Sequence, residues 1–172
     1  PFTISKSSER NHIALSRVKE TKLPLIYLNR TGGQDELIFD GTSFALNNDG
    51  NKFFCSAEFK EEISILDFER KNGKWIGNGN ITKSSSEIER LYKALVLGLR
   101  DYVNNNKFPG VVLGLSGGID SALVAAIATD AFGPSMVQSI MLPSNFTGQD
   151  SLNDAKDTCL LYTSDAADDL LC

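Results

Sequence analysis

The clearest pattern of apolar and polar positions lies in the second half of the chain. An apolar run over 110–113 predicts a buried parallel strand. After a short polar turn, the segment 122–132 is apolar on nearly every side, which predicts a buried helix. A further apolar run over 137–141 predicts a second strand, so residues 110–141 are expected to form one right-handed strand–helix–strand unit.

The first half of the chain predicts shorter elements. Residues 7–21 have the pattern of a helix. Two apolar runs over 38–46 and 52–59 flank a polar turn at 47–50, so we expect them to pair as a hairpin. The alternation over 63–68 predicts another strand.

A polar stretch rich in glycine, asparagine and serine covers residues 69–86 and predicts a linker between two domains. Ser86 and Glu89 have the spacing of a capping box, and apolar residues recur along one side of the helix that they open. We therefore divide the chain into a first domain over 1–68, the linker over 69–86, a second domain over 87–158 and a final segment over 159–172.

The final segment does not resemble natural protein sequence. Residues 159–168 (Cys-Leu-Leu-Tyr-Thr-Ser-Asp-Ala-Ala-Asp) are what translation of a transposon-end adapter from short-read sequencing libraries would give. We therefore expect residues 159–172 to be non-native and to make no native contacts. Because Pro1 is not a start residue, we also expect the chain to begin inside a domain, as an internal fragment.

Composition narrows the class of partner. The formal net charge is −5 and there is no basic cluster, so we expect no nucleic acid partner. No apolar stretch has the length of a membrane helix, and we expect no membrane partner. Cys55, the only cysteine before residue 159, fits a reducing cytoplasm and is expected to be a buried small side chain rather than a nucleophile. His12, the single histidine, is expected at the surface.

The polar turn before the predicted helix carries the candidate chemistry. Its adjacent glycines allow a sharp bend and a close approach of the backbone to a ligand, and its serines add hydroxyl donors. The start of the helix presents N–H groups to an anion. Asp120 would repel a phosphate group unless a Mg²⁺ ion lay between them. The turn therefore predicts a site for a metal-bound polyphosphate. Its sequence is Gly114-Leu115-Ser116-Gly117-Gly118-Ile119-Asp120-Ser121.

Two common phosphate loops do not fit this turn. A Walker A loop requires a lysine, and none lies between Gly114 and Ser121. A dinucleotide fingerprint requires a glycine where Ser116 stands. The turn instead resembles the S-G-G-x-D-S pyrophosphate loop of the ATP pyrophosphatase superfamily. Members of that superfamily cleave ATP to AMP and pyrophosphate, usually while adenylating a carboxylate or carbonyl oxygen.

Other segments narrow this resemblance. The run Gly-Val-Val-Leu-Gly-Leu-Ser-Gly-Gly-Ile-Asp-Ser-Ala-Leu over 110–123, with Met-Leu-Pro-Ser over 141–144, resembles the synthetase domain of glutamine-dependent NAD⁺ synthetases. Residues 151–155 resemble the next helix of that family. Residues 29–41 (Asn-Arg-Thr-Gly-Gly-Gln-Asp-Glu-Leu-Ile-Phe-Asp-Gly) resemble the late part of the nitrilase-type glutaminase domain fused to it, and residues 6–10 resemble the segment after its nucleophile region.

The resemblance implies an α/β fold. Its first part would be the C-terminal part of a nitrilase-like α-β-β-α sandwich, and its second the start of a Rossmann-like pyrophosphate-loop domain of the adenine nucleotide alpha hydrolase type. Asp120 would hold Mg²⁺, and Lys6 would contact glutamine. The glutaminase Glu, Lys and Cys of the family lie upstream of Pro1, so no catalytic residue is assigned. The implied ATP-binding residues are Gly114, Leu115, Ser116, Gly117, Gly118, Ile119, Asp120, Ser121, Met141 and Pro143.

The implied reaction converts deamido-NAD⁺ to NAD⁺. A carboxylate of the dinucleotide attacks the α-phosphate of ATP, pyrophosphate leaves, and ammonia from glutamine then displaces AMP. ATP and Mg²⁺ are the implied cofactors, deamido-NAD⁺ and glutamine or ammonia are the implied partners, and the intact enzyme is expected to be a cytoplasmic homo-oligomer. Three alternatives stay open: another pyrophosphate-loop enzyme such as a GMP synthetase or a tRNA-modifying ligase, a plain nitrilase-family amidase, and an inactive fragment.

Overall fold

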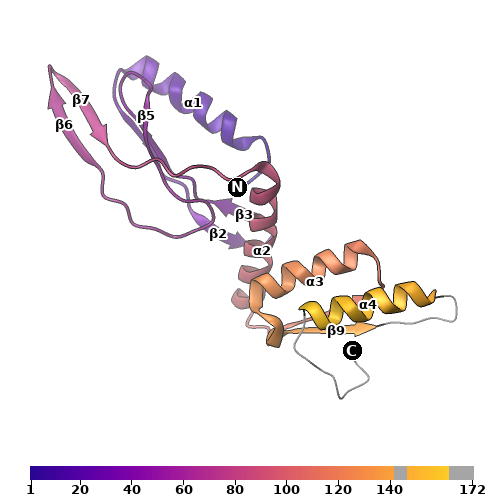
Figure 1. Ribbon diagram of the computed structural model, residues 1–172. Helices are drawn as coiled ribbons and strands as arrows, with labels where there is room; N and C mark the ends of the chain where they lie inside the picture. Colours follow the sequence, from indigo (N-terminus) through magenta and orange to yellow (C-terminus); the bar gives the residue numbers. More distant parts are fainter. Residues whose placement is uncertain (142–146, 163–172) are drawn as a thin grey trace. The chain divides into compact units, whose positions relative to one another are not determined.

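A computed structural model of the chain describes residues 1–141 and 147–162. The fold is a mixed α/β arrangement of helices with small sheets (Figure 1). Contacts divide the chain into two compact units, which we call unit 1 (Pro1–Ala94) and unit 2 (from Leu95 onward). Among the described residues, no helix is both long enough and apolar enough to cross a membrane.

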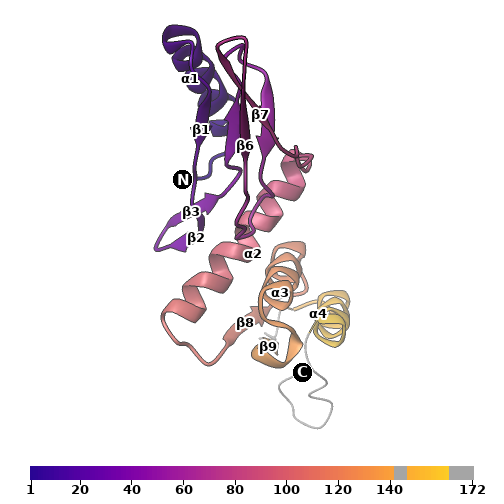
Figure 2. The ribbon, with the colours of Figure 1, turned by 90° about the vertical axis from the view of Figure 1, so that its left-hand side faces the viewer.

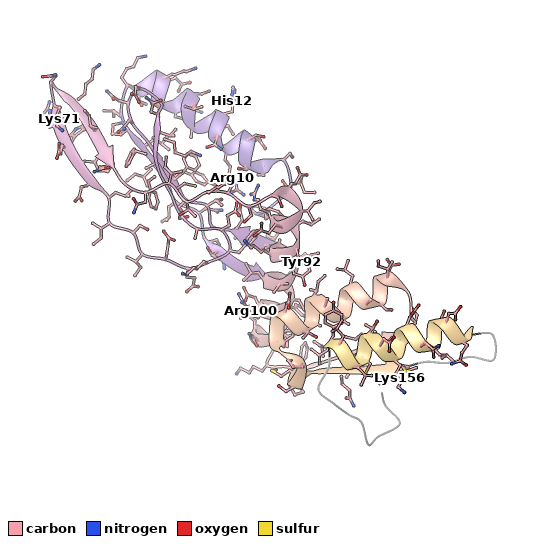
Figure 3. The ribbon with its side chains drawn as sticks, viewed as in Figure 1. Arg10, His12, Lys71, Tyr92, Arg100 and Lys156 are labelled. Carbon is pink, nitrogen blue, oxygen red and sulfur yellow. The ribbon has the colours of Figure 1, made fainter. Side chains whose placement is uncertain are left out.

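Unit 1 is built on an antiparallel sheet of three strands covered by one helix. The helix α1 (Lys6–Thr21) matches the predicted helix, and it buries Ala14 and Val18 against the sheet. The thiol of Cys55 lies in this core, where burial raises its pKa, and His12 is exposed on α1 (Figure 3). The expected burial of Cys55 and the expected exposure of His12 are confirmed. The strands, in their order across the sheet, are β1 (Leu25–Tyr27), β4 (Phe44–Leu46) and β5 (Lys52–Cys55).

Two β-hairpins complete unit 1. The first pairs β2 (Thr31–Gln34) with β3 (Leu37–Asp40), and the second pairs β6 (Asp67–Lys71) with β7 (Lys74–Asn78). The segment 69–86, which the sequence predicted as a linker, therefore begins within a β-hairpin. Most side chains of the second hairpin are exposed, which is consistent with its polar sequence. It contacts the three-stranded sheet through an edge-to-face contact between the rings of Phe68 and Phe53.

Two predicted strands differ from the structure. The strand expected over 38–46 is divided, because β3 ends at Asp40 and β4 begins at Phe44. The strand expected over 63–68 forms only from Asp67 onward. The two isoleucines of the predicted strand are exposed, Ile63 by 99% and Ile65 by 88%.

The break after β3 coincides with a group of buried charges that we call the Asp40 cluster: Asp40, Arg10, Arg90 and Glu58. The carboxylate of Asp40 is fully buried. Arg10 of α1 reaches both of its oxygens, at 2.9 and 3.1 Å, and Arg90 reaches one at 3.3 Å. Asn29 donates a further hydrogen bond of 3.0 Å, and Glu58 lies 3.1 Å from Nε of Arg90. The cluster therefore joins segments far apart in the sequence.

Unit 2 contains the predicted strand–helix–strand unit. The parallel strands β8 (Val111–Leu115) and β9 (Val137–Met141) are connected through α3 (Ile119–Phe132) and a short 3-10 turn, η1 (Pro134–Met136). The helices α3 and α4 (Gln149–Tyr162) lie side by side (Figures 1 and 2). Their buried residues Ala125, Ala155 and Cys159 pack with Leu115. The chain enters unit 2 through α2 (Glu87–Asn105), whose first turns belong to unit 1.

The expectation that residues 159–172 make no contacts is wrong over 159–162. These residues complete the last turn of α4, where Cys159 is 3% exposed. The carbonyl of Tyr162 accepts a 2.6 Å hydrogen bond from the hydroxyl of Thr129. Residues 163–172 lie outside the described residues. The non-native origin of the segment stays a prediction.

We predict that Asp40→Asn lowers the free energy of unfolding by about 3 kcal/mol, because it leaves buried arginines without their full countercharge. Glu20→Gln is the matched control, since it weakens an exposed ion pair with Arg17 and should change stability by less than about 1 kcal/mol. Chemical denaturation at matched pH measures both. Equal effects of the two substitutions would show that burial of Asp40 does not matter.

Candidate functional site

The predicted phosphate loop lies where the parallel strands of unit 2 end. β8 ends at Leu115 and α3 begins at Ile119, so Ser116, Gly117 and Gly118 form the whole connection. Leu115 pairs directly with Met141, the last residue of β9, which brings the ends of both strands to one edge. In open parallel sheets this carboxyl edge is where ligands bind.

The two glycines of the loop meet different constraints. Gly117 has a φ of +80°, which disfavours any side chain, and a Cβ there would collide with the carbonyl of Ser151 in the first turn of α4. Gly118 has a φ of −87°, and the nearest atom that its Cβ would meet is Oγ of Ser116 at 3.4 Å, an ordinary contact. Packing within the chain therefore requires glycine at 117. It leaves open space beside 118, where a ligand could approach the backbone.

The two serines of the loop hold it closed. The hydroxyl of Ser121 donates a 2.8 Å hydrogen bond to the carbonyl of Gly118 and accepts one of 3.3 Å from the N–H of Ser116. The hydroxyl of Ser116 accepts a 3.3 Å hydrogen bond from the N–H of Gly118 and lies 3.2 Å from that of Ser121. The loop thus has a defined shape before any ligand binds, which reduces the entropy lost on binding.

Asp120 lies in the first turn of α3 with its side chain exposed. Within the described parts of the chain, no three histidine, cysteine or acidic side chains are grouped closely enough to form a metal site of their own. A single exposed carboxylate such as that of Asp120 fits the coordination of Mg²⁺ better than that of a metal bound only by protein side chains. Mg²⁺ keeps several waters and is commonly held by one or two carboxylates together with substrate phosphates.

An open hollow beside the loop adds two carboxylates that the sequence analysis missed. Asp154 and Asp157 of α4 line it together with Gly117, Gly118 and Ile119 of the loop. Their spacing of three residues places both on one side of a helix, and this was the only signal in the sequence that could have identified them. The hollow therefore has the backbone of the loop on one side and the acidic side of α4 on the other.

The other predicted site residues are not gathered here. Met141 packs on the apolar core around Leu115, and Pro143 lies outside the described residues. Lys6 begins α1 in unit 1, where its ammonium group lies 3.3 Å from the carboxylate of Glu9. The structure therefore brings together Gly114 to Ser121 and Met141, while the roles given to Lys6 and Pro143 stay predictions.

The contrast between the two glycines gives a paired prediction. Gly117→Ala should lower the thermal stability of unit 2, because its Cβ would push against the backbone of α4. Gly118→Ala should leave stability nearly unchanged and weaken nucleotide binding by roughly tenfold, as expected when about 1.4 kcal/mol of ligand contact is lost. Thermal unfolding and nucleotide titration of the complete protein that contains this chain measure the two effects. Equal destabilisation by both substitutions would contradict this division.

Comparison with known proteins agrees with these features. Residues 91–164 match the family model described as NAD synthase. The chain is 48% identical to a glutamine-dependent NAD(+) synthetase of Rhodobacter capsulatus over 91% of its own length and 29% of that protein. It is 45% identical to the enzyme of that name from Acinetobacter baylyi, over 90% of the chain and 28% of the relative.

Solved structures give the same result. The structure of a glutamine-dependent NAD⁺ synthetase from Acinetobacter baumannii, in complex with ADP, superposes with a TM-score of 0.87 at 40% identity. The match covers 94% of this chain and 31% of that one. A glutamine-dependent NAD(+) synthetase from Cytophaga hutchinsonii, at 17% identity and a TM-score of 0.71, supports the fold alone. The chain spans about three tenths of the length of the relatives it matches, and it belongs to the family of glutamine-dependent NAD⁺ synthetases.

Proposed function

We propose that this chain is part of an ATP-dependent amidating ligase that converts deamido-NAD⁺ to NAD⁺ with ammonia from glutamine. The observation that carries the proposal is the loop Ser116–Ser121, which has both the pyrophosphate-loop sequence and an open, preformed backbone at the carboxyl edge of a parallel sheet. The ADP complex of the relative from Acinetobacter baumannii supports a nucleotide as the ligand. Activity is assigned to the complete protein and not to this chain alone.

The finer assignment of the fold is part of the same proposal. Unit 1 corresponds to the C-terminal part of a nitrilase-like glutaminase domain, and unit 2 to the start of a Rossmann-like pyrophosphate-loop domain. The helix-covered sheet of unit 1 supports the first assignment, and the parallel strand–helix–strand unit of unit 2 supports the second. The division of contacts between Ala94 and Leu95, within α2, supports a domain boundary a few residues after the predicted linker.

In the proposed reaction, the loop binds and orients the pyrophosphate that leaves from ATP. The first N–H groups of α3 have no partner within the helix and can donate to phosphate oxygens. Ser116 can turn its hydroxyl proton from Ser121 toward the ligand without breaking the bond between Ser121 and Gly118. Mg²⁺ bound at Asp120 would neutralise charge on the leaving group. These donors stabilise negative charge where it develops during adenylation.

The remaining partners follow from the family assignment. Deamido-NAD⁺ supplies the carboxylate that is adenylated, and glutamine supplies ammonia in the glutaminase part of the complete protein. Lys6, at the start of α1, is assigned a contact with glutamine. The proposal further places the complete protein in the cytoplasm, which agrees with a buried, unpaired Cys55 in unit 1. The family assignment adds a homo-oligomer to the proposal.

The reaction products test this function directly. We predict that the complete protein forms NAD⁺ from deamido-NAD⁺, ATP and glutamine, with one AMP and one pyrophosphate for each NAD⁺. Separation of nucleotides by chromatography, with a coupled pyrophosphate assay, measures the stoichiometry. Formation of ADP, or the absence of an amidated product, would refute the proposed function.

The metal-side role of Asp120 gives a second test. Asp120→Asn keeps the size of an exposed side chain, so the fold should be unchanged. Because one major charge-stabilising contact is lost, adenylation should fall by roughly 10²-fold, and the concentration of Mg²⁺ needed for half-maximal rate should rise. Asp130→Asn, at an exposed position of the same helix, is the control and should leave the rate within about twofold of the unaltered enzyme. Normal turnover and normal Mg²⁺ dependence of Asp120→Asn would exclude this role.

A further inference from the structure

The proposed reaction gives no role to Arg10, a charged residue of α1 whose side chain is only 9% exposed (Figure 3). Its guanidinium binds the fully buried carboxylate of Asp40 as a fork, with Nη2 2.9 Å from one oxygen and Nη1 3.1 Å from the other. Apolar residues of similar size are often as stabilising as a buried ion pair, or more so. Stability alone therefore does not explain the arginine, and its further contacts point to a second role.

The same guanidinium holds two backbone segments that are far apart in the sequence. Nη2 donates a 3.1 Å hydrogen bond to the carbonyl of Pro1, and Nη1 donates one of 3.2 Å to the hydroxyl of Thr42. Thr42 has a φ of +49°, in the left-handed region that β-branched residues avoid. Its hydroxyl donates a 3.0 Å hydrogen bond to Asp40. Backbone strain of this kind persists only where the surroundings hold it, and it is concentrated at functional sites.

The short segment that joins Pro1 to Lys6 is attached to the end of β3. The N–H of Phe2 donates a hydrogen bond to the carbonyl of Ile38 in that strand. The N–H of Lys6 donates one of 3.2 Å to the carbonyl of Thr3. The first turn of α1 is therefore held to the sheet region from its N-terminal side by this segment and from the helix itself by the buried arginine.

Lys6 and Arg10 are four residues apart in α1, so they lie on the same side of the helix, about 6 Å apart along its axis. Arg10 is the buried member of the pair, whereas the side chain of Lys6 is 44% exposed and lies 3.3 Å from Glu9. An ammonium group has three donors, so Lys6 can bind a further acceptor beside Glu9. A shift or rotation of this turn would move that ammonium group relative to the rest of unit 1.

We propose that Arg10 is a positioning residue for the glutamine half of the reaction. By binding Asp40 and the carbonyl of Pro1, it holds the first turn of α1 where Lys6 contacts glutamine. The inference rests on the proposed function and on the contact assigned there to Lys6. A lysine supplies a compact positive charge that fits the α-carboxylate of an amino acid, and a charge held in place before binding costs less entropy on binding. Loss of the anchor therefore weakens glutamine binding and leaves the use of free ammonium unchanged.

The test is a double-mutant cycle in the complete protein, with Arg10→Lys, Lys6→Met and the double variant. Lysine at position 10 keeps the charge but cannot bind both oxygens of Asp40 and the carbonyl of Pro1 as a fork does. Arg10→Lys should raise the KM for glutamine roughly tenfold, which corresponds to about 1.4 kcal/mol, and leave kcat within about twofold. Because Arg10 acts through Lys6, adding Arg10→Lys to Lys6→Met should raise the KM little further.

Two controls separate positioning from general damage. Arg17→Lys makes the same exchange at an exposed, paired arginine of α1 and should leave the KM for glutamine unchanged. NAD⁺ formation with ammonium chloride in place of glutamine should stay within about twofold of the unaltered enzyme in every variant.

Each outcome decides the assignment. A fall in kcat at unchanged KM would show that Arg10 affects only the amount of folded protein and would overturn the inference. Additive effects of the two substitutions, or an unchanged KM in Lys6→Met, would overturn it as well. If Arg10→Lys does not accumulate as folded protein, Thr42→Val provides the same cycle with a smaller rise in KM, because it removes one hydroxyl that binds Arg10 and keeps the size of the side chain.

Failure of the inference is distinguishable from failure of the proposed function. If the unaltered protein forms no NAD⁺ from glutamine, the proposed function fails and the role of Arg10 fails with it. An unaltered protein that is active with glutamine, together with an Arg10→Lys variant of normal KM, would refute the inference alone.

Discussion

The ionic contact between Asp40 and Arg10 is the constraint on which the organisation of unit 1 depends. A carboxylate fully removed from water is tolerated only where charged donors surround it. Two arginines on different helices and an asparagine meet that need, so α1, the end of β3 and the beginning of α2 must converge on one point. The chain leaves β3 at this point, and β3 and β4 are separate strands that pair in different sheets.

The features predicted most accurately from the sequence are those whose signals lie close together along the chain. The βαβ unit and its loop are local, and all of their signals lie within 110–141. The Asp40 cluster was not predicted, because Arg90 lies 50 residues from Asp40 and nothing in the sequence pairs them. The β6–β7 hairpin was also missed. Its strands are polar on most positions, and the aromatic contact that docks it becomes visible only when the sheet is formed.

Alternation of apolar and polar residues gave a wrong prediction where the exposure of the side chains does not follow the pattern. Ile63 and Ile65 have the spacing of a strand with one buried face, yet both are almost fully exposed. In α2 the apolar stripe was predicted correctly as a helix, but Ile88 at its start is 82% exposed while Ala94, Leu97 and Val103 are buried. A periodic pattern therefore identifies the type of element more securely than the side that packs, because packing depends on partners that the pattern does not contain.

The close approach of Gly117 to Ser151 has a consequence for how such loops can be moved between proteins. The backbone of α4 packs directly against the loop at Gly117, so the conformation of the eight-residue motif depends on a helix outside it. The smallest transferable module would run from Gly110 through α4, because α3 and α4 share one apolar core with the strand that precedes the loop. Grafting the motif onto another strand–helix junction would reproduce its sequence without the backbone conformation that it has beside α4.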